Sequence, residues 1–330
     1  MNDFYADKTI LITGGTGFLG SRLVKKLLFR ENPKKVISFS RRWDDGERLL
    51  RETSDSRLRV INGDICDLGA ISTAMKGVDL VIHTAAYKNV PMGEYNAFEC
   101  TRVNVFGSMN VASAAIENGV EKVLGISSDK ATDPCNTYGA TKRLMEGLLI
   151  SANNKGSTRF SVARYGNVSM STGAVIPYYH SLMRAGADSL PVTVPRMTRF
   201  WIKHSEATDY VLDWLEHMMG GETYVPRLKS STIEDLVTAF GLLYGKPVEM
   251  KIIGSRPGEK RHEGMISETE VERTVAYHWT YMIYPQQHDW DKDYQLKDGF
   301  QWVDDTFTCN SDTVERFTMA ELYDLIEDES

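Results

Sequence analysis

The sequence has 330 residues, of which 42% are hydrophobic and 25% are charged, as is usual for a globular protein. Its formal net charge of −7, with no long run of Lys or Arg, argues against nucleic acid or an anionic membrane surface as the main partner. Because no apolar stretch approaches the roughly 18 residues of a membrane span and the first residues lead into a strand pattern without a signal-peptide core, we expect a cytoplasmic protein.

The first half of the chain alternates short apolar runs with helix-like stretches. The apolar runs are nearly continuous, which is typical of strands in a sheet that is covered on both faces. We expect these strands at residues 9–13, 36–40, 58–61, 80–83, 123–127 and 159–164. We expect helices at residues 18–29, 71–75, 103–118 and 138–153. This alternation predicts an α/β fold with a Rossmann-type doubly wound parallel sheet.

The pattern changes after Tyr165. Capping-box sequences at residues 231–234 and 318–321 each predict the start of an amphipathic helix, and residues 248–253 read as a strand. These features predict a smaller α+β lobe. The expected boundaries are a first domain at residues 1–167, to which residues of about 193–220 cross back, and the lobe at residues 168–330.

A glycine-rich turn joins the first predicted strand to the first predicted helix. Gly14, Gly17 and Gly20 occupy it in the segment LITGGTGFLG. Glycine lets the backbone turn tightly and approach a pyrophosphate, while the helix N-terminus supplies unpaired N–H groups. Since strand, glycines and helix come in this order, we predict a dinucleotide site; the alternative is a merely tight strand–helix turn.

The end of the second predicted strand indicates which dinucleotide binds. NAD-selective folds usually carry Asp or Glu there, whereas this chain has Ser40, Arg41 and Arg42. Arginine suits a ribose 2′-phosphate, so we expect NADP rather than NAD in the first domain, with a solvated basic turn as the alternative. Asp64, after the third predicted strand, could hydrogen-bond an adenine or simply cap the surface chain.

The segment SSDKATDPCNTYGATK, residues 127–142, gathers proton-transfer groups at the end of the fifth predicted strand. Tyr138 and Lys142 form a Tyr-x-x-x-Lys pair whose side chains share one face of a helix. A nearby ammonium lowers the pKa of a phenol, so Tyr138 is a candidate general base. Ser128 could bind a substrate hydroxyl, and the alternative for Asp129 and Lys130 is a surface ion pair.

On these motifs the chain resembles the extended short-chain dehydrogenase/reductases, and more closely the soluble UDP-N-acetylglucosamine 4,6-dehydratases of the inverting type. The similar blocks are TGGTGFLG, HTAAYKNVPMGEYNAFECTRVNVFG, SSDKATDPCNTYGATK, ARYGNV, MTRFWI and RPGEKRHE. Two stretches differ. The segment SMSTGAVIP lacks an arginine that relatives often carry near the substrate diphosphate, and TVAYHWTYMIYPQQHDW has no clear counterpart.

The resemblance implies roles in the dehydration of UDP-N-acetylglucosamine. Tyr138 would take the 4-hydroxyl proton as hydride leaves C4 for NADP, while Lys142 holds the cofactor ribose. Lys130, with a lowered pKa, would remove the C5 proton, and Asp129 would protonate the leaving 6-hydroxyl. Hydride then returns to C6 and C5 is reprotonated with inversion. The product expected is UDP-2-acetamido-2,6-dideoxy-L-arabino-hexos-4-ulose.

Motifs and resemblance together nominate three sets of site residues. The catalytic set is Ser128, Asp129, Lys130, Tyr138 and Lys142. The cofactor-binding set is Gly14, Gly17, Phe18, Leu19, Gly20, Ser40, Arg41, Arg42, Asp64, Ile65, Ala85, Ala86, Lys88, Asn104, Tyr138 and Lys142, although Asn104 could instead tighten a sheet–helix junction. The substrate-binding set is Lys88, Asn167, Arg199, Arg256 and Glu259. The Cys and His spacings predict reduced thiols and no metal site.

Other readings remain open at this point. Within enzymes, the alternatives are a retaining 4,6-dehydratase and a nucleotide-sugar 4-epimerase. A non-catalytic NADP-binding protein is a different class, but such proteins typically lose the Tyr or the Lys of the pair. Apolar positions on helices 103–118 and 138–153 suit a helix-pair interface and predict a homo-oligomer. Many relatives carry N-terminal membrane spans, and this chain is expected to be soluble without one.

Overall fold

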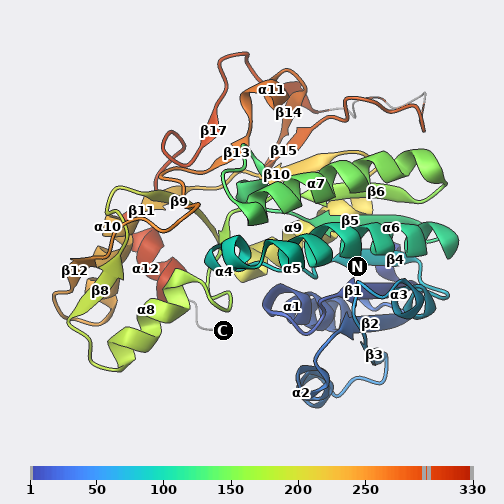
Figure 1. Ribbon diagram of the computed structural model, residues 1–330, viewed down its shortest axis with the longest axis horizontal. Helices are drawn as coiled ribbons and strands as arrows, with labels where there is room; N and C mark the ends of the chain where they lie inside the picture. The colour runs from blue at the N-terminus through green and yellow to red at the C-terminus, as the bar shows by residue number, and fades with distance from the viewer. Residues whose placement is uncertain (1–2, 292–294, 296–298, 328–330) are drawn as a thin grey trace.

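A ten-stranded sheet forms the centre of the computed structural model, which describes residues 3–291, 295 and 299–327. The other positions of the two predicted domains lie outside the described residues. The strand order is β16-β14-β15-β10-β6-β5-β4-β1-β2-β3 (Figure 1). The bounds are β1 (Thr9–Thr13), β2 (Lys35–Ser40), β3 (Leu58–Asn62), β4 (Leu80–His83), β5 (Lys122–Ile126), β6 (Arg159–Ala163), β10 (Thr223–Pro226), β14 (Thr274–Tyr277), β15 (Thr280–Ile283) and β16 (Gln301–Trp302).

The seven neighbouring strands β10-β6-β5-β4-β1-β2-β3 run parallel, and this confirms the predicted Rossmann-type α/β fold. Beyond β10 the sheet continues through the antiparallel strands β15, β14 and β16. The sequence analysis predicted no strands in this extension. They are short, and β14 and β15 are joined by a tight turn at His278, whose φ is 44°.

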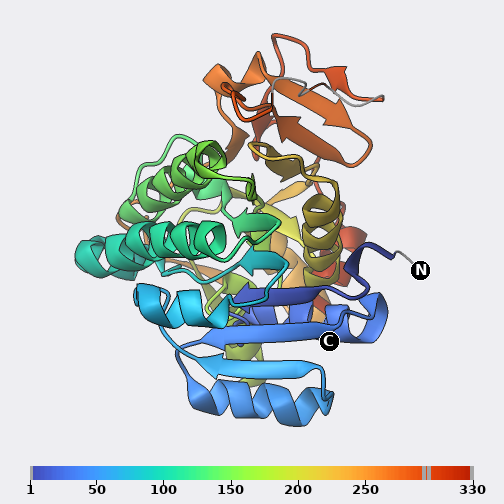
Figure 2. The ribbon, with the colours of Figure 1, turned by 90° about the vertical axis from the view of Figure 1, so that its right-hand side faces the viewer.

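Helices cover both faces of the sheet (Figure 2). Ile10 and Ile12 of β1 pack toward α1, α2 and α9, whereas Leu11 packs toward α3, α6 and α7. This alternation explains the continuous apolar runs, since both sides of each strand are buried. The bounds are α1 (Phe18–Lys26) with η2 (Leu27–Glu31), α2 (Trp43–Thr53), α3 (Leu68–Ala74), α4 (Val90–Tyr95), α5 (Ala97–Thr101), η3 (Arg102–Phe106), α6 (Gly107–Glu117), α7 (Thr137–Ala152) and α9 (His204–His217).

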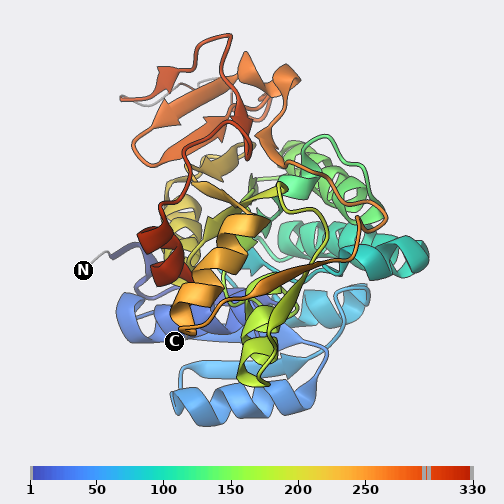
Figure 3. The same ribbon diagram turned by 90° about the vertical axis from the view of Figure 1, so that its left-hand side faces the viewer.

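A second group of elements packs around its own apolar cluster beside the carboxyl ends of the parallel strands (Figure 3). Leu190, Trp201, Phe240 and Leu322 belong to this cluster. The elements are β7 (Asn167–Val168), α8 (Val175–Arg184), β8 (Ser189–Val192), β9 (Thr198–Ile202), β11 (Ser230–Thr232), α10 (Ile233–Leu243), β12 (Glu249–Ile252) and α12 (Met319–Glu327). A smaller cluster lies under β13 (Gly264–Ile266), α11 (Glu268–Val271) and β17 (Cys309–Asn310). In the part of the chain that the structure describes, no helix is long and apolar enough to cross a membrane.

Two local predictions can be compared directly with the structure. The capping box at residues 318–321 is present, because the Glu321 carboxylate accepts the N–H of Thr318 at 2.9 Å. The other box was placed one residue too early: Thr232 caps α10, and its partner is Asp235. Thr-Ile-Glu-Asp offers two acids in succession, and the backbone turn, rather than the sequence pattern, selects the second. Helices α2 and α9 were also not predicted.

Candidate active site

The glycine turn has the geometry that a pyrophosphate site requires. Gly14 adopts φ +66°, and its N–H donates to the Phe39 carbonyl at 2.7 Å. A Cβ on Gly20 would lie 2.3 Å from the Gly14 carbonyl oxygen, so a side chain there is excluded. Gly17 precedes α1 and offers no side-chain cap, which leaves N–H groups of the first turn available to an anion. The turn therefore fits a dinucleotide pyrophosphate.

The ends of β2 and β3 form the next part of the same cavity. The Ser40 hydroxyl is buried without a hydrogen-bond partner among the described residues, which fits a site completed by a ligand. The Arg41 and Arg42 side chains are 61% and 76% exposed, and each has an acidic neighbour, Glu99 or Asp45. Two exposed guanidinium groups beside an unpaired hydroxyl are compatible with a ribose phosphate.

Asp64, after β3, is held mainly by its own neighbours. It accepts the N–H of Cys66 at 3.0 Å and lies 3.3 Å from the Arg102 guanidinium. Burial opposes ionisation of Asp64, but these contacts hold its pKa below the usual range. Its carboxylate thus remains anionic at the cavity wall.

One cavity of about 960 Å³ connects the glycine turn to the segment after β5. It brings together most of the residues nominated from the sequence: Gly14, Gly17, Phe18, Leu19, Gly20, Ser40, Arg41, Arg42, Asp64, Ile65, Ala85, Ala86, Lys88, Ser128, Lys130, Tyr138, Lys142, Asn167, Arg199, Arg256 and Glu259. Among the described residues that line it, Asn104 and Asp129 do not appear. The lining of this cavity thus includes both the glycine turn and the predicted substrate-binding residues.

The hydrogen bonds of Asn104 go to the protein itself, although Asn104 was nominated as a cofactor-binding residue. Its amide accepts the N–H of Tyr87 at 2.7 Å and donates to the Tyr87 carbonyl at 3.0 Å. It also donates to the Thr141 hydroxyl at 3.0 Å, and only 1% of the residue is exposed. These bonds join the chain after β4 to α7, so the alternative weighed for Asn104, a sheet–helix junction, describes its position.

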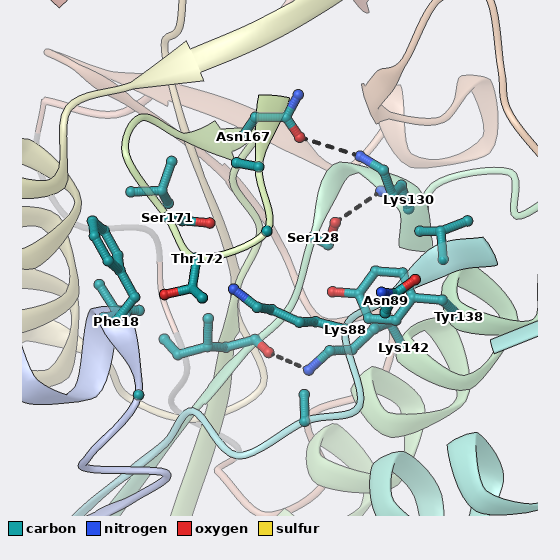
Figure 4. A pocket seen from close by; sticks show the side chains of 18 of the residues that line it. Phe18, Lys88, Asn89, Ser128, Lys130, Tyr138, Lys142, Asn167, Ser171 and Thr172 are labelled. Atoms are coloured by element: carbon teal, nitrogen blue, oxygen red, sulfur yellow. Dashed lines mark hydrogen bonds between the residues drawn. The ribbon is translucent and has the colours of Figure 1, made fainter. Parts of the chain in front are cut away.

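The catalytic segment starts where β5 ends. Residues 129–131 form a short 3-10 turn, η4 (Asp129–Ala131), and α7 then begins after Asn136, whose side chain caps the N–H of Gly139 at 2.7 Å. Figure 4 shows Ser128, Lys130, Tyr138 and Lys142 converging from these two elements on the cavity. The strand end and the helix start therefore position the predicted proton-transfer groups together.

Tyr138 is nearly buried, and burial raises its pKa to about 12. The charge of Lys130 and a hydrogen bond with Ser128 oppose this rise. The positive charge that opposes this rise is that of Lys130, and the expectation that Lys142 lowers the pKa of Tyr138 stays a prediction. Lys142 donates instead to the Ile126 carbonyl at 2.7 Å, and burial lowers its own pKa to about 8.

Lys130 also differs from its predicted state. Burial by itself would lower the pKa of Lys130, but Asp129 and Glu263 together raise it well above the usual range. The ammonium lies 3.0 Å from Asp129 and 3.5 Å from Glu263. The prediction of a lowered pKa assumed desolvation or a neighbouring cation; the amine is desolvated, but the two carboxylates beside it outweigh that effect. In the structure Lys130 is an ammonium group, and it needs a proton acceptor before it can act as a base.

The substrate side of the cavity is built from β7, β9 and the loop of RPGEK. Asn167 accepts from Lys130 at 3.4 Å. Arg199 is 7% exposed and donates to the carbonyls of Thr198, Lys260 and Arg261 at 2.8 to 3.2 Å. Arg199 thus anchors the loop. Much of its donor capacity is already used by these carbonyls, whereas a residue that binds a diphosphate needs free donors.

The same loop positions Arg256. Glu259 accepts the backbone N–H of Arg256 at 3.1 Å, which closes the turn and places the exposed Arg256 side chain at the cavity. The loop is docked on the catalytic segment, since the Asn136 amide donates to the Gly258 carbonyl at 2.8 Å. Arg256 is therefore better placed than Arg199 to meet an anionic group of a ligand.

Several cavity residues were missed from the sequence. Figure 4 shows Asn89, Ser171 and Thr172 near Lys88, whose pKa burial lowers. The position of residues 171–173 directly after β7, at the carboxyl side of a strand, is a signal that could have found them. Glu263 also lines the cavity, and it directly precedes β13. It is the last residue of the block RPGEKRHE, and that block is a signal that could have found it.

Comparisons with known proteins show the family to which the chain belongs. The profile of the family described as "Polysaccharide biosynthesis protein" matches residues 10–285. An inverting UDP-N-acetylglucosamine 4,6-dehydratase of Campylobacter jejuni is 41% identical over 313 residues, which cover 90% of this chain and 92% of the relative. A UDP-glucose 4-epimerase of Rickettsia felis is 35% identical over 98% of this chain and 96% of its own length.

Among solved structures, that of Pen from Bacillus thuringiensis superposes with a TM-score of 0.91. It is 31% identical in sequence, and the match covers 99% of both chains. These similarities confirm the resemblance to the inverting dehydratases that the sequence motifs indicated. The chain belongs to the polysaccharide biosynthesis protein family.

Proposed function

We propose that the protein is a UDP-N-acetylglucosamine 4,6-dehydratase that inverts C5 and releases UDP-2-acetamido-2,6-dideoxy-L-arabino-hexos-4-ulose and water. The observation that carries this proposal is the single cavity that joins the glycine turn to Tyr138, Lys142 and Lys130. The 41% identity to an inverting dehydratase supports the same substrate. Such a lyase needs no external reductant, since the sugar is oxidised at C4 and reduced at C6 in one cycle.

The cofactor proposed is NADP, with NAD as the less favoured choice. Gly14, Gly17 and Gly20 would hold its pyrophosphate, and Arg41 and Arg42 would face the 2′-phosphate. A bound nicotinamide dinucleotide would supply the hydride acceptor and donor. The remaining chemistry belongs to the side chains of this protein.

For the oxidation at C4, Tyr138 would accept the proton of the 4-hydroxyl. Burial raises the pKa of Tyr138, so the phenolate needs a positive charge near it, and Lys130 supplies one. Lys142 would hold the cofactor ribose. Ser128 lies beside Tyr138 at the cavity and would orient the sugar hydroxyl.

For the elimination, the C5 hydrogen is acidified by the new ketone at C4. Lys130 in its neutral form would remove that proton, and a carboxyl group of the cluster around Lys130 would protonate the departing 6-hydroxyl. Asn167 contacts Lys130 and would keep its amine directed into the cavity. Arg256 would bind the diphosphate, while Glu259 fixes the turn that carries it.

The test is mass spectrometry of UDP-N-acetylglucosamine after incubation with the pure protein and NADP. Loss of one water identifies a dehydratase. The second candidate, a nucleotide-sugar 4-epimerase, is favoured by the 35% identity to the Rickettsia felis protein, and it would conserve the mass of the sugar. In deuterated water, deuterium at C5 with inverted configuration separates the inverting from the retaining class. Tyr138→Phe should give neither product nor reduced cofactor.

The division of the chain is proposed as expected from the sequence: an NADP-binding domain at residues 1–167, with residues of about 193–220 crossing back, and a substrate-binding lobe at residues 168–330. The protein is proposed to act in the cytoplasm as a homo-oligomer. Phe98, Phe106, Met109 and Leu144 are exposed apolar side chains on or beside α5, α6 and α7, and they support a helix-pair interface. Sedimentation of the pure protein measures the number of subunits.

A further inference from the structure

Glu263 is a buried carboxylate at the wall of the reaction cavity. Only 2% of the residue is exposed, and its Oε1 lies 3.5 Å from the Lys130 ammonium. Its Oε2 is buried with no hydrogen-bond partner among the described residues, and the Lys260 ammonium lies 3.9 Å from it. The backbone is fixed, because the Glu263 N–H donates to the Ser311 hydroxyl at 2.8 Å and its carbonyl accepts the Ser311 N–H at 2.8 Å.

An unpaired carboxylate oxygen in such a place is costly unless a ligand donates to it or a proton occupies it. Burial raises the pKa of Glu263, the charge of Lys130 opposes this, and the charge of Asp129 adds to it. A carboxyl group in this environment binds a proton more readily than an exposed one. Glu263 therefore has the properties of a general acid that faces the cavity.

Asp129 lies less favourably for that role. It is 1% exposed, and its Oδ1 accepts from the Ser128 hydroxyl at 2.7 Å and from Lys130 at 3.0 Å. Its Oδ2 is also without a partner, but Asp129 is not among the described residues that line the cavity. Its Oδ1 is already occupied by these two donors, which suits a residue that holds Lys130 in place.

We propose that Glu263 is a catalytic residue of the elimination and protonates the departing 6-hydroxyl; this deepens the proposed function and rests on it. The ammonium of Lys130 first passes a proton to Glu263, which yields a neutral amine and a carboxylic acid. The amine then takes the C5 proton, the C5–H electron pair forms the C5–C6 double bond, and the C6–O bond breaks. The hydroxyl leaves as water with the proton of Glu263, so that ammonium and carboxylate are restored.

The distance between Lys130 and Glu263 is compatible with this exchange. At 3.5 Å it is longer than a good hydrogen bond, as is common for catalytic pairs before a substrate closes around them. Asp129, 3.0 Å from the Lys130 ammonium, acts as the positioning residue for Lys130. The Asp129–Lys130–Glu263 cluster thus provides base, acid and anchor within one wall of the cavity.

The experiment compares two substrates in the Glu263→Gln variant of the full-length enzyme. With UDP-N-acetylglucosamine, kcat should fall about 100-fold, since the general acid is lost. With the 6-deoxy-6-fluoro analogue, the rate should stay within about 10-fold of the unmodified enzyme, because fluoride leaves without prior protonation. Oxidation at C4 should persist, and reduced cofactor absorbance should build up with the natural substrate.

Three further variants keep the result interpretable. Glu263→Asp retains a carboxylic acid and should recover part of the lost rate even if Glu263→Gln is unstable. Glu268→Gln removes an exposed carboxylate from the neighbouring helix α11 and should leave both rates unchanged. Asp129→Asn should slow both substrates alike, as expected when only the position of Lys130 is disturbed.

The outcomes separate the inference from the function on which it rests. If the unmodified enzyme forms no dehydrated sugar, the proposed function is wrong and the inference falls with it. If that enzyme is active and Glu263→Gln keeps its rate on the natural substrate, only the assignment of Glu263 is overturned. The acid role would return to Asp129 under two results together. Glu263→Gln would slow both substrates equally, and Asp129→Asn would slow the natural substrate but not the fluoro analogue.

Discussion

Replacing Glu270 by Gln tests the buried charge network behind the active site. Arg164 is 1% exposed, and its Nη1 and Nη2 each donate to a Glu270 oxygen at 2.8 Å. The same guanidinium donates to Glu146 of α7 at 2.8 and 2.7 Å. The network therefore ties α11 to the helix that carries Tyr138. A glutamine can accept only one of the two bonds and turns an N–H donor toward the other.

The size of the effect follows from the pKa of Glu270. Burial raises this pKa, but hydrogen bonds and charge from Arg164 outweigh burial and lower it from 4.5 to about 2. At about 1.4 kcal/mol per pKa unit, the difference corresponds to about 3 kcal/mol. Because the folded value is the lower one, this stabilisation is complete above about pH 4.5 and is lost as the pH falls to about 2.

Gln resembles the protonated carboxyl, so Glu270→Gln should lower the free energy of unfolding at pH 7 by about 3 kcal/mol. With an unfolding entropy of about 2.1 cal/mol/K per residue, the melting temperature should fall by about 4 °C. Urea titration followed by tryptophan fluorescence measures the difference, which should narrow between pH 4.5 and pH 3. The exposed Glu268→Gln should change stability by less than about 0.5 kcal/mol. A difference below about 1 kcal/mol at pH 7, or one that stays constant to pH 3, would refute the reasoning.

Three other substitutions have defined expectations. Gly139→Ala would place a Cβ 2.1 Å from the Lys130 carbonyl oxygen and should reduce turnover more than 10-fold, whereas Gly147→Ala in the same helix meets nothing within 4 Å and should raise stability by about 0.5–1 kcal/mol. Burial lowers the pKa of Lys142 to about 8, so its charge destabilises the fold throughout the range below pH 8. Lys142→Met should therefore raise the free energy of unfolding of the cofactor-free protein by about 1–3 kcal/mol, as measured by urea titration at pH 7. The same substitution should abolish dehydration. Arg41→Ala should narrow the preference for NADP over NAD in a fluorescence titration, and equal affinities in the unmodified protein would contradict that preference.

Local sequence determined the parallel part of the fold except β10, together with the cofactor end of the site. Continuous apolar runs such as TILIT can be buried on both faces only in a sheet with helices on each side, so pattern alone predicted β1 to β6. The glycine turn was equally predictable, because Gly14 needs a positive φ and Gly20 has no room for a Cβ. The serine, tyrosine and lysines after β5 could be grouped because they lie within 16 residues on one strand end and one helix start.

The tertiary structure decided the charge states and the partners. Asp129, the neighbour of Lys130 in sequence, and Glu263 together raise the pKa of Lys130, and the fold brings Glu263 to the site from far along the chain. Arg199 was predicted to bind the substrate diphosphate because arginine suits phosphate. The fold directs its donors to the carbonyls of Lys260 and Arg261. Electrostatic fields and hydrogen bonds act between neighbours in space. The sequence could therefore name the chemical groups of this site, and only their packing fixes which of them hold protons.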